Sequence, residues 1–200
     1  MIKPRERDMK SKILTGALAG ILSVIGLAHG EEIKGEIMGK KNLVVYFSVY
    51  ENTKKLAETI HAQVGGDIVR IDPVVAYMSD KADYEKLADY AKNERDTDAR
   101  PQYKDLGVNI ADYDNIFVGY PIWWYTLPMI MYTFFEQNDF SGKTIIPFNT
   151  HEGSSDGGTY KTIAEWEPNA TILPGLPIRG ENMANDQTET VKSWLERICK

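Results

Sequence analysis

The sequence predicts an α/β fold in which a doubly wound, mainly parallel sheet of five strands carries helices on both faces. Two observations indicate this class. From residue 42 onward, short apolar runs alternate with stretches of helical periodicity, and such alternation implies right-handed crossovers between parallel strands. The first run, LVVYF (43–47), is apolar at nearly every position, as expected for a strand that is covered on both faces.

The elements of the first half follow in a regular order. After the strand at 43–47, residues 53–64 repeat apolar side chains at helical spacing, and Gly65-Gly66 ends this helix. DIVRID (67–72) is the second predicted strand, and a charged helix is predicted over 80–95. The inner side of that helix is formed by four residues: Tyr84, Leu87, Ala88 and Ala91.

The second half continues the alternation. Its predicted strands are NIFVGYP (115–121), KTIIPFNT (143–150) and ATIL (170–173). The predicted helices are a very apolar one at 128–137, a short one at 160–165 and a closing one at 186–198. In the closing helix the apolar residues fall on one side: Val191, Trp194, Leu195 and Ile198.

Composition and charge describe an ordinary globular chain with an acidic body. Of the 200 residues, 42% are hydrophobic and 26% charged, and the net charge is −6. Residues 1–30 carry five basic and two acidic side chains, which leaves −9 for the rest. Nucleic acids and anionic membranes need positive protein surface, so neither is an expected partner. One cysteine, Cys199, excludes an intramolecular disulfide.

The positive start of the chain has the layout of a secretory signal. Basic residues precede an uncharged run over 13–28, and Ala28-His29-Gly30 supplies small residues before Glu31-Glu32. We therefore expect residues 1–30 to be a signal peptide, residues 31–41 a short joint and residues 42–200 one exported domain. An uncleaved membrane anchor is the alternative, although the run is short against the roughly 20 residues that span a bilayer.

Three loops leave the carboxyl ends of predicted strands, where parallel sheets of this class bind ligands. The first contains Ser48, Asn52 and Thr53, whose hydroxyl and amide groups, with the amides of the helix start, could hold a phosphate. Asn52 or Thr53 could equally be a simple helix cap.

The second loop, PIWWYTLP (121–128), carries Trp123, Trp124 and Tyr125. A flat ring gains by stacking on such side chains, although both tryptophans could instead pack beneath the following helix. The third loop, 150–158, is rich in small residues that let backbone amides approach a ligand. His151 in it is a candidate proton donor or a solvated loop residue. With no second histidine or cysteine nearby, no metal site is predicted.

The segments GYPIWW (119–124) and DFSGKTIIPFNTHEGSS (139–155), with YFS…NT after the first strand, resemble the flavodoxin family and its bacterial FMN-dependent reductase branch. The resemblance implies a flavodoxin-like sheet in the order 2-1-3-4-5 with the cofactor FMN at its edge. It assigns the isoalloxazine ring to Trp123 or Trp124. The implied FMN-binding residues are Ser48, Tyr50, Asn52, Thr53, Pro121, Ile122, Trp123, Trp124, Tyr125, Asn149, Thr150, His151, Glu152, Gly153 and Ser154.

This chain departs from the family pattern at three positions. Tyr50 replaces a hydroxyl residue, Glu51 replaces a glycine, and Tyr125 stands where relatives have a small residue. Glu51 would repel a phosphate by about 1 kcal/mol in water and more in a drier site. We expect its carboxylate to be turned aside, towards solvent.

The resemblance implies an exported FMN-binding redox protein that transfers electrons or reduces a small acceptor such as a quinone. The acidic body would suit a basic redox partner protein. The alternative is a binding module of the same fold with a degenerate flavin site. A hydrolase is not indicated, since no Gly-x-Ser-x-Gly elbow follows any strand.

Overall fold

The sheet of this computed structural model, which describes residues 40–199, has the order β2-β1-β3-β4-β5. Every strand pair in it is parallel. The predicted order, 2-1-3-4-5, is confirmed. The strands are β1 (Asn42–Tyr46), β2 (Asp67–Arg70), β3 (Asn115–Pro121), β4 (Thr144–His151), β5 (Thr171–Ile172) and β6 (Leu176–Arg179).

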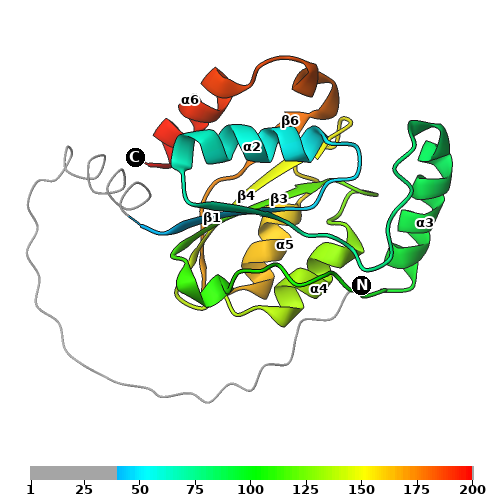
Figure 1. The fold of residues 1–200 in the computed structure, drawn as a ribbon, viewed down its shortest axis with the longest axis horizontal. Coiled ribbons are helices and arrows are strands. Elements are labelled where there is room, and N and C mark those ends of the chain that lie inside the picture. The colour runs from blue at the N-terminus through cyan, green and yellow to red at the C-terminus, as the bar shows by residue number, and fades with distance from the viewer. Residues whose placement is uncertain (1–39, 200) are drawn as a thin grey trace, which may run out of the picture.

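Helices cover both faces of the sheet (Figure 1), as predicted. Helices α2 and α6 lie on one face, and α4 and α5 lie on the other. The long helices are α2 (Asn52–Val64), α3 (Tyr84–Asp96), α4 (Met129–Gln137), α5 (Thr159–Trp166) and α6 (Thr188–Ile198). Short 3-10 helices lie at Lys81–Asp83, Ile110–Asp112 and Gly180–Ala184.

The alternation of side chains along the strands produces two apolar cores. Leu43 and Val45 of β1 enter the core on the α4 and α5 side. Val44 enters the core on the α2 and α6 side, together with Ile60 and Trp194. Because both cores are built on β1, β3 and β4, these central strands are fixed from two sides.

The fifth strand position is divided between β5 and β6, and β6 was not predicted. The predicted strand at 170–173 is reduced to two residues, and the break falls at Pro174-Gly175. A side chain at Gly175 would meet the Tyr160 ring at 2.4 Å. The Pro174 carbonyl accepts the Trp194 indole N–H at 2.9 Å. The chain therefore leaves β4 at Pro174-Gly175 and pairs with it again further along.

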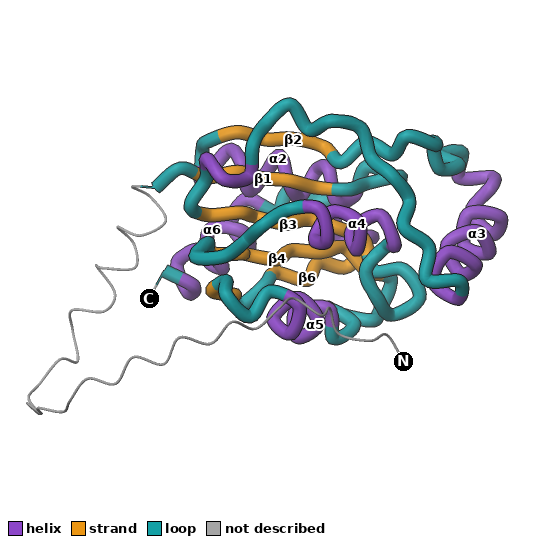
Figure 2. The backbone as a smooth tube through the Cα atoms, turned by 90° about the horizontal axis from the view of Figure 1, so that it is seen from below, coloured by secondary structure: helices purple, strands orange, loops and turns teal. Residues whose placement is uncertain are grey.

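Helix α3 lies beyond one end of the strands rather than over a face of the sheet (Figure 2). It begins at Tyr84, after a 3-10 turn, instead of at residue 80. Its buried Glu94 accepts hydrogen bonds from the Tyr77 hydroxyl at 2.9 and 3.2 Å. This contact attaches the second half of α3 to the segment that precedes it.

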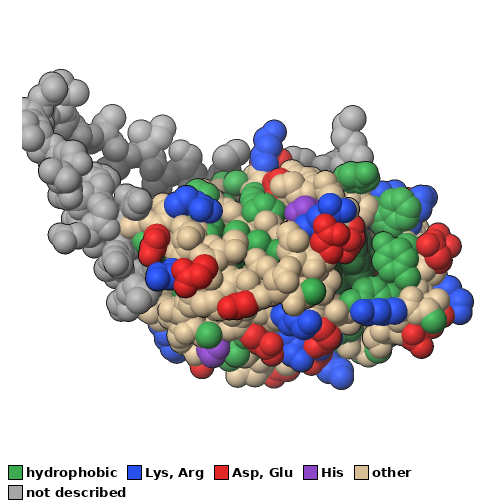
Figure 3. Space-filling view, turned by 90° about the horizontal axis from the view of Figure 1, so that it is seen from above, with side chains coloured by type: hydrophobic (Ala, Val, Ile, Leu, Met, Phe, Trp, Pro, Cys, Tyr) green, Lys and Arg blue, Asp and Glu red, His purple; other side chains and the backbone are tan. Residues whose placement is uncertain are grey.

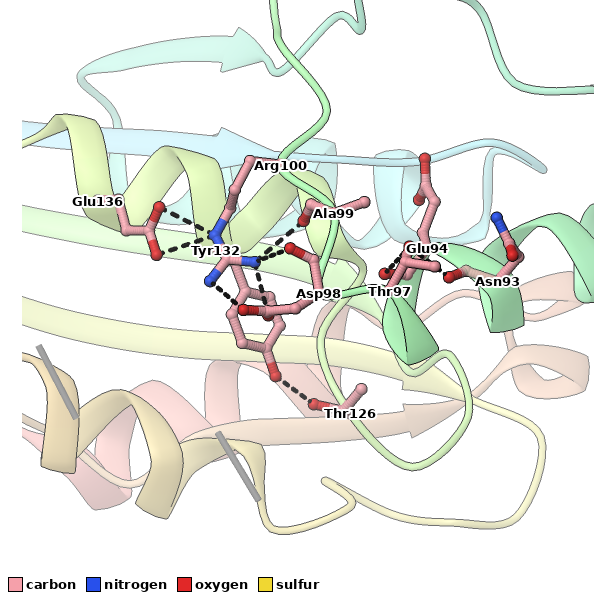
Figure 4. Close-up of polar contacts among 9 residues, drawn as sticks. All are labelled: Asn93, Glu94, Thr97, Asp98, Ala99, Arg100, Thr126, Tyr132 and Glu136. Carbon is pink, nitrogen blue, oxygen red and sulfur yellow. Dashed lines mark hydrogen bonds and ion pairs between the residues drawn. The ribbon is translucent and has the colours of Figure 1, made fainter. Parts of the chain in front are cut away.

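The segment after α3 is attached to α4 through Arg100 (Figure 4). The Arg100 Nε lies 2.9 Å from both oxygens of Glu136, and one terminal nitrogen donates to Asp98 Oδ1 at 2.7 Å. The guanidinium also lies over the Tyr132 ring, whose hydroxyl bonds Thr126 Oγ1 at 2.7 Å. The end of α3 and the loop after β3 are thus attached to the same helix.

The predicted signal peptide, residues 1–30, and nearly all of the joint at 31–41 lie outside the described residues. Between residues 40 and 199, no helix is long and apolar enough to cross a membrane.

Candidate functional site

A cleft of about 690 Å³ opens at the carboxyl ends of β1, β3 and β4. All three predicted loops line it, and α3 forms a further wall. A second hollow, of about 430 Å³, lies between α2 and the segment before α6, and its lining residues within 40–199 include no aromatic side chain. The first cleft is therefore the candidate site for a flat ring.

The first loop leads into α2 at a residue, Glu51, whose own side chain makes no capping hydrogen bond to the helix. The N-cap is Glu51, so the simple-cap alternative for Asn52 and Thr53 does not describe this turn. The Thr53 hydroxyl instead lies 2.8 Å from the hydroxyl of Thr150, at the end of β4. The first amides of α2 have no partner within the helix, and this makes the turn a site for an anion.

The backbone of Glu51 is left-handed, with φ 67°. This conformation would suit the glycine that the family pattern has at this position. Its carboxylate is 2.7 Å from Lys54 Nζ and 3.4 Å from an Arg70 terminal nitrogen, and it does not line the cleft. The hydrogen bond from Lys54, with Arg70 nearby, holds the pKa of Glu51 below its usual range. Glu51 is turned aside, as expected, although two basic side chains hold it there rather than solvent alone.

The second loop forms a tight turn in which Trp123 and Thr126 exchange two backbone hydrogen bonds, both of 3.0 Å. Between them, Trp124 and Tyr125 have φ values of 50° and 63°. Bulky side chains rarely adopt this conformation, and each costs about 1–2 kcal/mol. The turn therefore holds two aromatic side chains at the cleft against a backbone cost.

The two tryptophans of this turn have different surroundings. Trp123 is half-buried and meets the rings of Phe47 and Tyr77 edge-on, at centroid distances of 5.4 and 5.3 Å. Trp124 is 40% exposed and donates its indole N–H to the Ala88 carbonyl of α3 at 2.8 Å. Both indoles line the cleft. Figure 3 shows hydrophobic side chains gathered at the α3 end of the molecule.

The third loop is held by Asn149, which is fully buried and does not line the cleft. Its amide donates to the Ser155 carbonyl at 3.0 Å, and its side-chain oxygen accepts from the Tyr160 hydroxyl. The prediction that Asn149 contacts the cofactor is not supported by this geometry, because its side chain is committed to the loop. The other predicted binding residues all line the cleft.

His151 lies at the cleft with its Nδ1 accepting the backbone N–H of Gly153 at 2.9 Å. Burial, with Arg179 nearby, lowers the pKa of His151, so the imidazole is neutral at pH 7. A neutral ring with an occupied Nδ1 carries its proton on Nε2. His151 can thus donate one hydrogen bond into the cleft, whereas an imidazolium acid is disfavoured.

Sequence reasoning missed the wall made by α3. Its lining residues are Tyr84, Glu85, Leu87, Ala88, Asp89 and Ala91, joined from the first loop by Val49. Helical periodicity had identified the correct side of this helix, namely Tyr84, Leu87, Ala88 and Ala91. What it could not indicate is that this side faces a cleft.

Comparison with known proteins assigns the family. Residues 41–198 match the family model described as Flavodoxin. A candidate flavoprotein of Bacteroides eggerthii is 33% identical over 80% of this chain and 99% of its own, with a TM-score of 0.70. A second one, from Bacteroides uniformis, is also 33% identical, over 78% of this chain and 97% of its own, with a TM-score of 0.68.

A flavoprotein of Lactobacillus acidophilus, solved in complex with FMN, shares the fold at 19% identity and a TM-score of 0.58, over 76% of this chain and 99% of its own. Among curated proteins, none matches the chain. The family match covers nearly all of the described residues, and this chain belongs to the flavodoxin family.

Proposed function

We propose that this chain binds FMN in the cleft and works as a redox protein that passes electrons to a small acceptor or a partner protein. The observation that carries the proposal is the meeting of two kinds of wall in one cleft. Uncapped amides and buried hydroxyls lie at the start of α2, and two indoles lie at the turn after β3. FMN, which the family assignment supports as cofactor, combines a phosphate with a flat ring.

The residues present fit the two ends of this cofactor. Ser48, Asn52 and Thr53, with the first amides of α2, would hold the phosphate without a lysine in direct contact. Trp123 and Trp124 would lie against the ring. When bound, the flavin supplies transfer of one or two electrons.

Other side chains would set the surroundings of that chemistry. Lys54 and Arg70 neutralise Glu51 beside the anion site, and His151 offers an Nε2 proton at the third loop. Glu152 also lines the cleft. Its Oε1 and the amide nitrogen of Asn52 both lie close to Gly180, at 2.5 and 3.0 Å from the position of an added Cβ.

Titration of the full chain with FMN tests the proposal. We expect quenching of flavin fluorescence on binding, and binding about tenfold weaker in Thr53→Val, which loses a hydroxyl at the phosphate turn. Thr59→Val is the matched control, because Thr59 lies on the same helix and its hydroxyl donates to the Lys55 carbonyl. Thermal melting of both apo variants separates a loss of binding from a loss of folding.

A protein that remains colourless and leaves FMN fluorescence unchanged would refute the proposal. That result would favour a cofactor-free binding module, a reading motivated by Tyr50, whose ring stacks on Tyr84 at 6.3 Å within the cleft. For a chain that binds FMN, turnover of NADH or NADPH with a quinone separates an enzyme from a carrier. Export of the domain is also proposed, and sequencing the N-terminus of the mature protein tests it.

A further inference from the structure

Helix α3 adds a side to the cleft that the phosphate and ring assignments do not use. Six of its residues line the cleft, and the Trp124 indole bonds the Ala88 carbonyl at the middle of the helix. The Arg95 guanidinium lies over the ring of Trp124, 5.5 Å from its centroid. The helix and the turn after β3 thus contact each other directly, and residues of both line the same cleft.

The rings on this side suit a planar ligand. Tyr50 and Tyr84 stack with an angle of 28° between their planes. Tyr84 is 53% exposed, and Tyr125 on the opposite turn is 76% exposed. Leu87, Ala88 and Ala91 also line this side of the cleft with apolar side chains. Exposed aromatic side chains around a cleft favour the stacking of a flat, apolar molecule.

The charge on this side is acidic. Glu85 and Asp89 are four residues apart, so they lie on one side of the helix, and both line the cleft. No lysine or arginine is among the lining residues of the described chain. The basic residues of α3 are paired with carboxylates: Lys86 pairs with Asp83, and Lys92 and Arg95 pair with Asp96. Arg95, in the last turn of α3, also lies against Trp124. Among the lining residues of the described chain, an anionic group beside Glu85 and Asp89 would meet these two carboxylates and no lysine or arginine.

We propose that α3 forms an acceptor subsite for planar aromatic compounds that are uncharged or cationic, and that Glu85 and Asp89 reject anionic ones. The proposal rests on the proposed function for its redox role. It adds a division of the cleft by charge, with the anion site at the start of α2 and the acceptor site against α3. The diphosphate of a nicotinamide dinucleotide would be unfavourable beside the same two carboxylates.

Binding calorimetry with ring compounds of similar size and different charge tests the subsite. The probes are menadione, naphthoquinone sulfonate and N-methylquinolinium, each titrated into the full chain with and without FMN. We expect the anionic probe to bind about tenfold more weakly than the neutral one, because both carboxylates repel it through water. The difference should shrink at about 0.5 M salt, because dissolved ions screen the exposed carboxylates from the probe.

A charge variant and its control isolate the two carboxylates. Glu85→Gln/Asp89→Asn should bring the anionic probe to within about twofold of the neutral one. Glu189→Gln/Glu196→Gln removes the same charge from exposed positions on α6 and should leave the difference intact. Equal binding of all probes by the native chain, or equal effects of the two variants, would overturn the subsite.

The outcomes also separate this inference from the proposed function. If FMN does not bind but the apo chain discriminates by charge, the subsite stands and the redox function is refuted. If FMN binds and discrimination is absent, the redox function stands and the subsite is refuted.

Discussion

Replacing Glu51 with glycine changes both the backbone and the charge at the start of helix α2. The native side chain occupies a left-handed conformation, with φ 67°, and its carboxylate pairs with Lys54 and Arg70. Glu51→Gly removes the conformational strain and leaves two basic side chains unneutralised beside the proposed phosphate site. The variant therefore tests the electrostatic and the conformational parts of the site together.

The expected change in stability is small, because the contributions oppose one another. Relief of the left-handed conformation gains about 1–2 kcal/mol. The greater freedom of glycine in the unfolded chain costs about 0.4–1 kcal/mol, and each exposed ion pair that is lost costs about 0.2–1 kcal/mol. We expect the free energy of unfolding to change by less than about 1 kcal/mol.

The expected change in affinity for FMN is larger. Removing one negative charge near a phosphate gains about 1 kcal/mol through water, which corresponds to about fivefold tighter binding. Fluorescence titration at low and high salt measures this gain, which should fade as salt screens the charges. Glu51→Gln, which removes the charge and keeps the strained side chain, should give the same affinity with lower stability than Glu51→Gly.

Glu189→Gln, on α6, controls for net charge and should leave the affinity unchanged. The reasoning is refuted if Glu51→Gly and Glu51→Gln both bind FMN as the native chain does at low salt. That outcome would place the phosphate away from the start of α2.

Three further variants test separate features. Tyr125→Gly should raise the melting temperature, because relief of about 1–2 kcal/mol of left-handed strain exceeds the entropy cost of about 0.4–1 kcal/mol. Burial raises the pKa of Glu94, so the folded state favours its protonated form and its charge costs stability above the folded pKa. Glu94→Gln should therefore be more stable than the native chain at pH 8, with a gain that disappears in melts as the pH falls towards about 4.3. For His151 the pKa is lowered, so the native chain should lose stability as the pH falls below about 6.5, and His151→Asn should flatten that part of the profile measured by denaturant unfolding.

The strand order followed from the resemblance to the flavodoxin family, whereas the apolar central strands by themselves predicted a mainly parallel sheet that is covered on both faces. β3 was predicted with its observed ends, Asn115–Pro121. The edge was predicted less well. LPIR at 176–179 contains a proline that argues against a central strand, yet it pairs with β4 at the sheet border, where proline is tolerated.

The site was predicted from three loops because parallel topology brings the carboxyl ends of strands together. The role of Asn149 could not be predicted, since its partners Ser155 and Tyr160 come from the loop and helix after it. The position of Glu51 depends on Arg70 of β2, a contact made only in the folded sheet. Periodicity found the inner side of α3, although nothing local indicates that this helix lies beyond the strand ends.

The borders of the sheet have a consequence for how copies of the protein behave at high concentration. β2, at one border, spans four residues, and the other border is divided between β5, with two residues, and β6, with four. Pro177 within β6 lacks an N–H to offer to a neighbouring chain. Short and interrupted borders are poor templates for strand addition, so concentrated solutions of the folded chain should resist the growth of intermolecular β-structure.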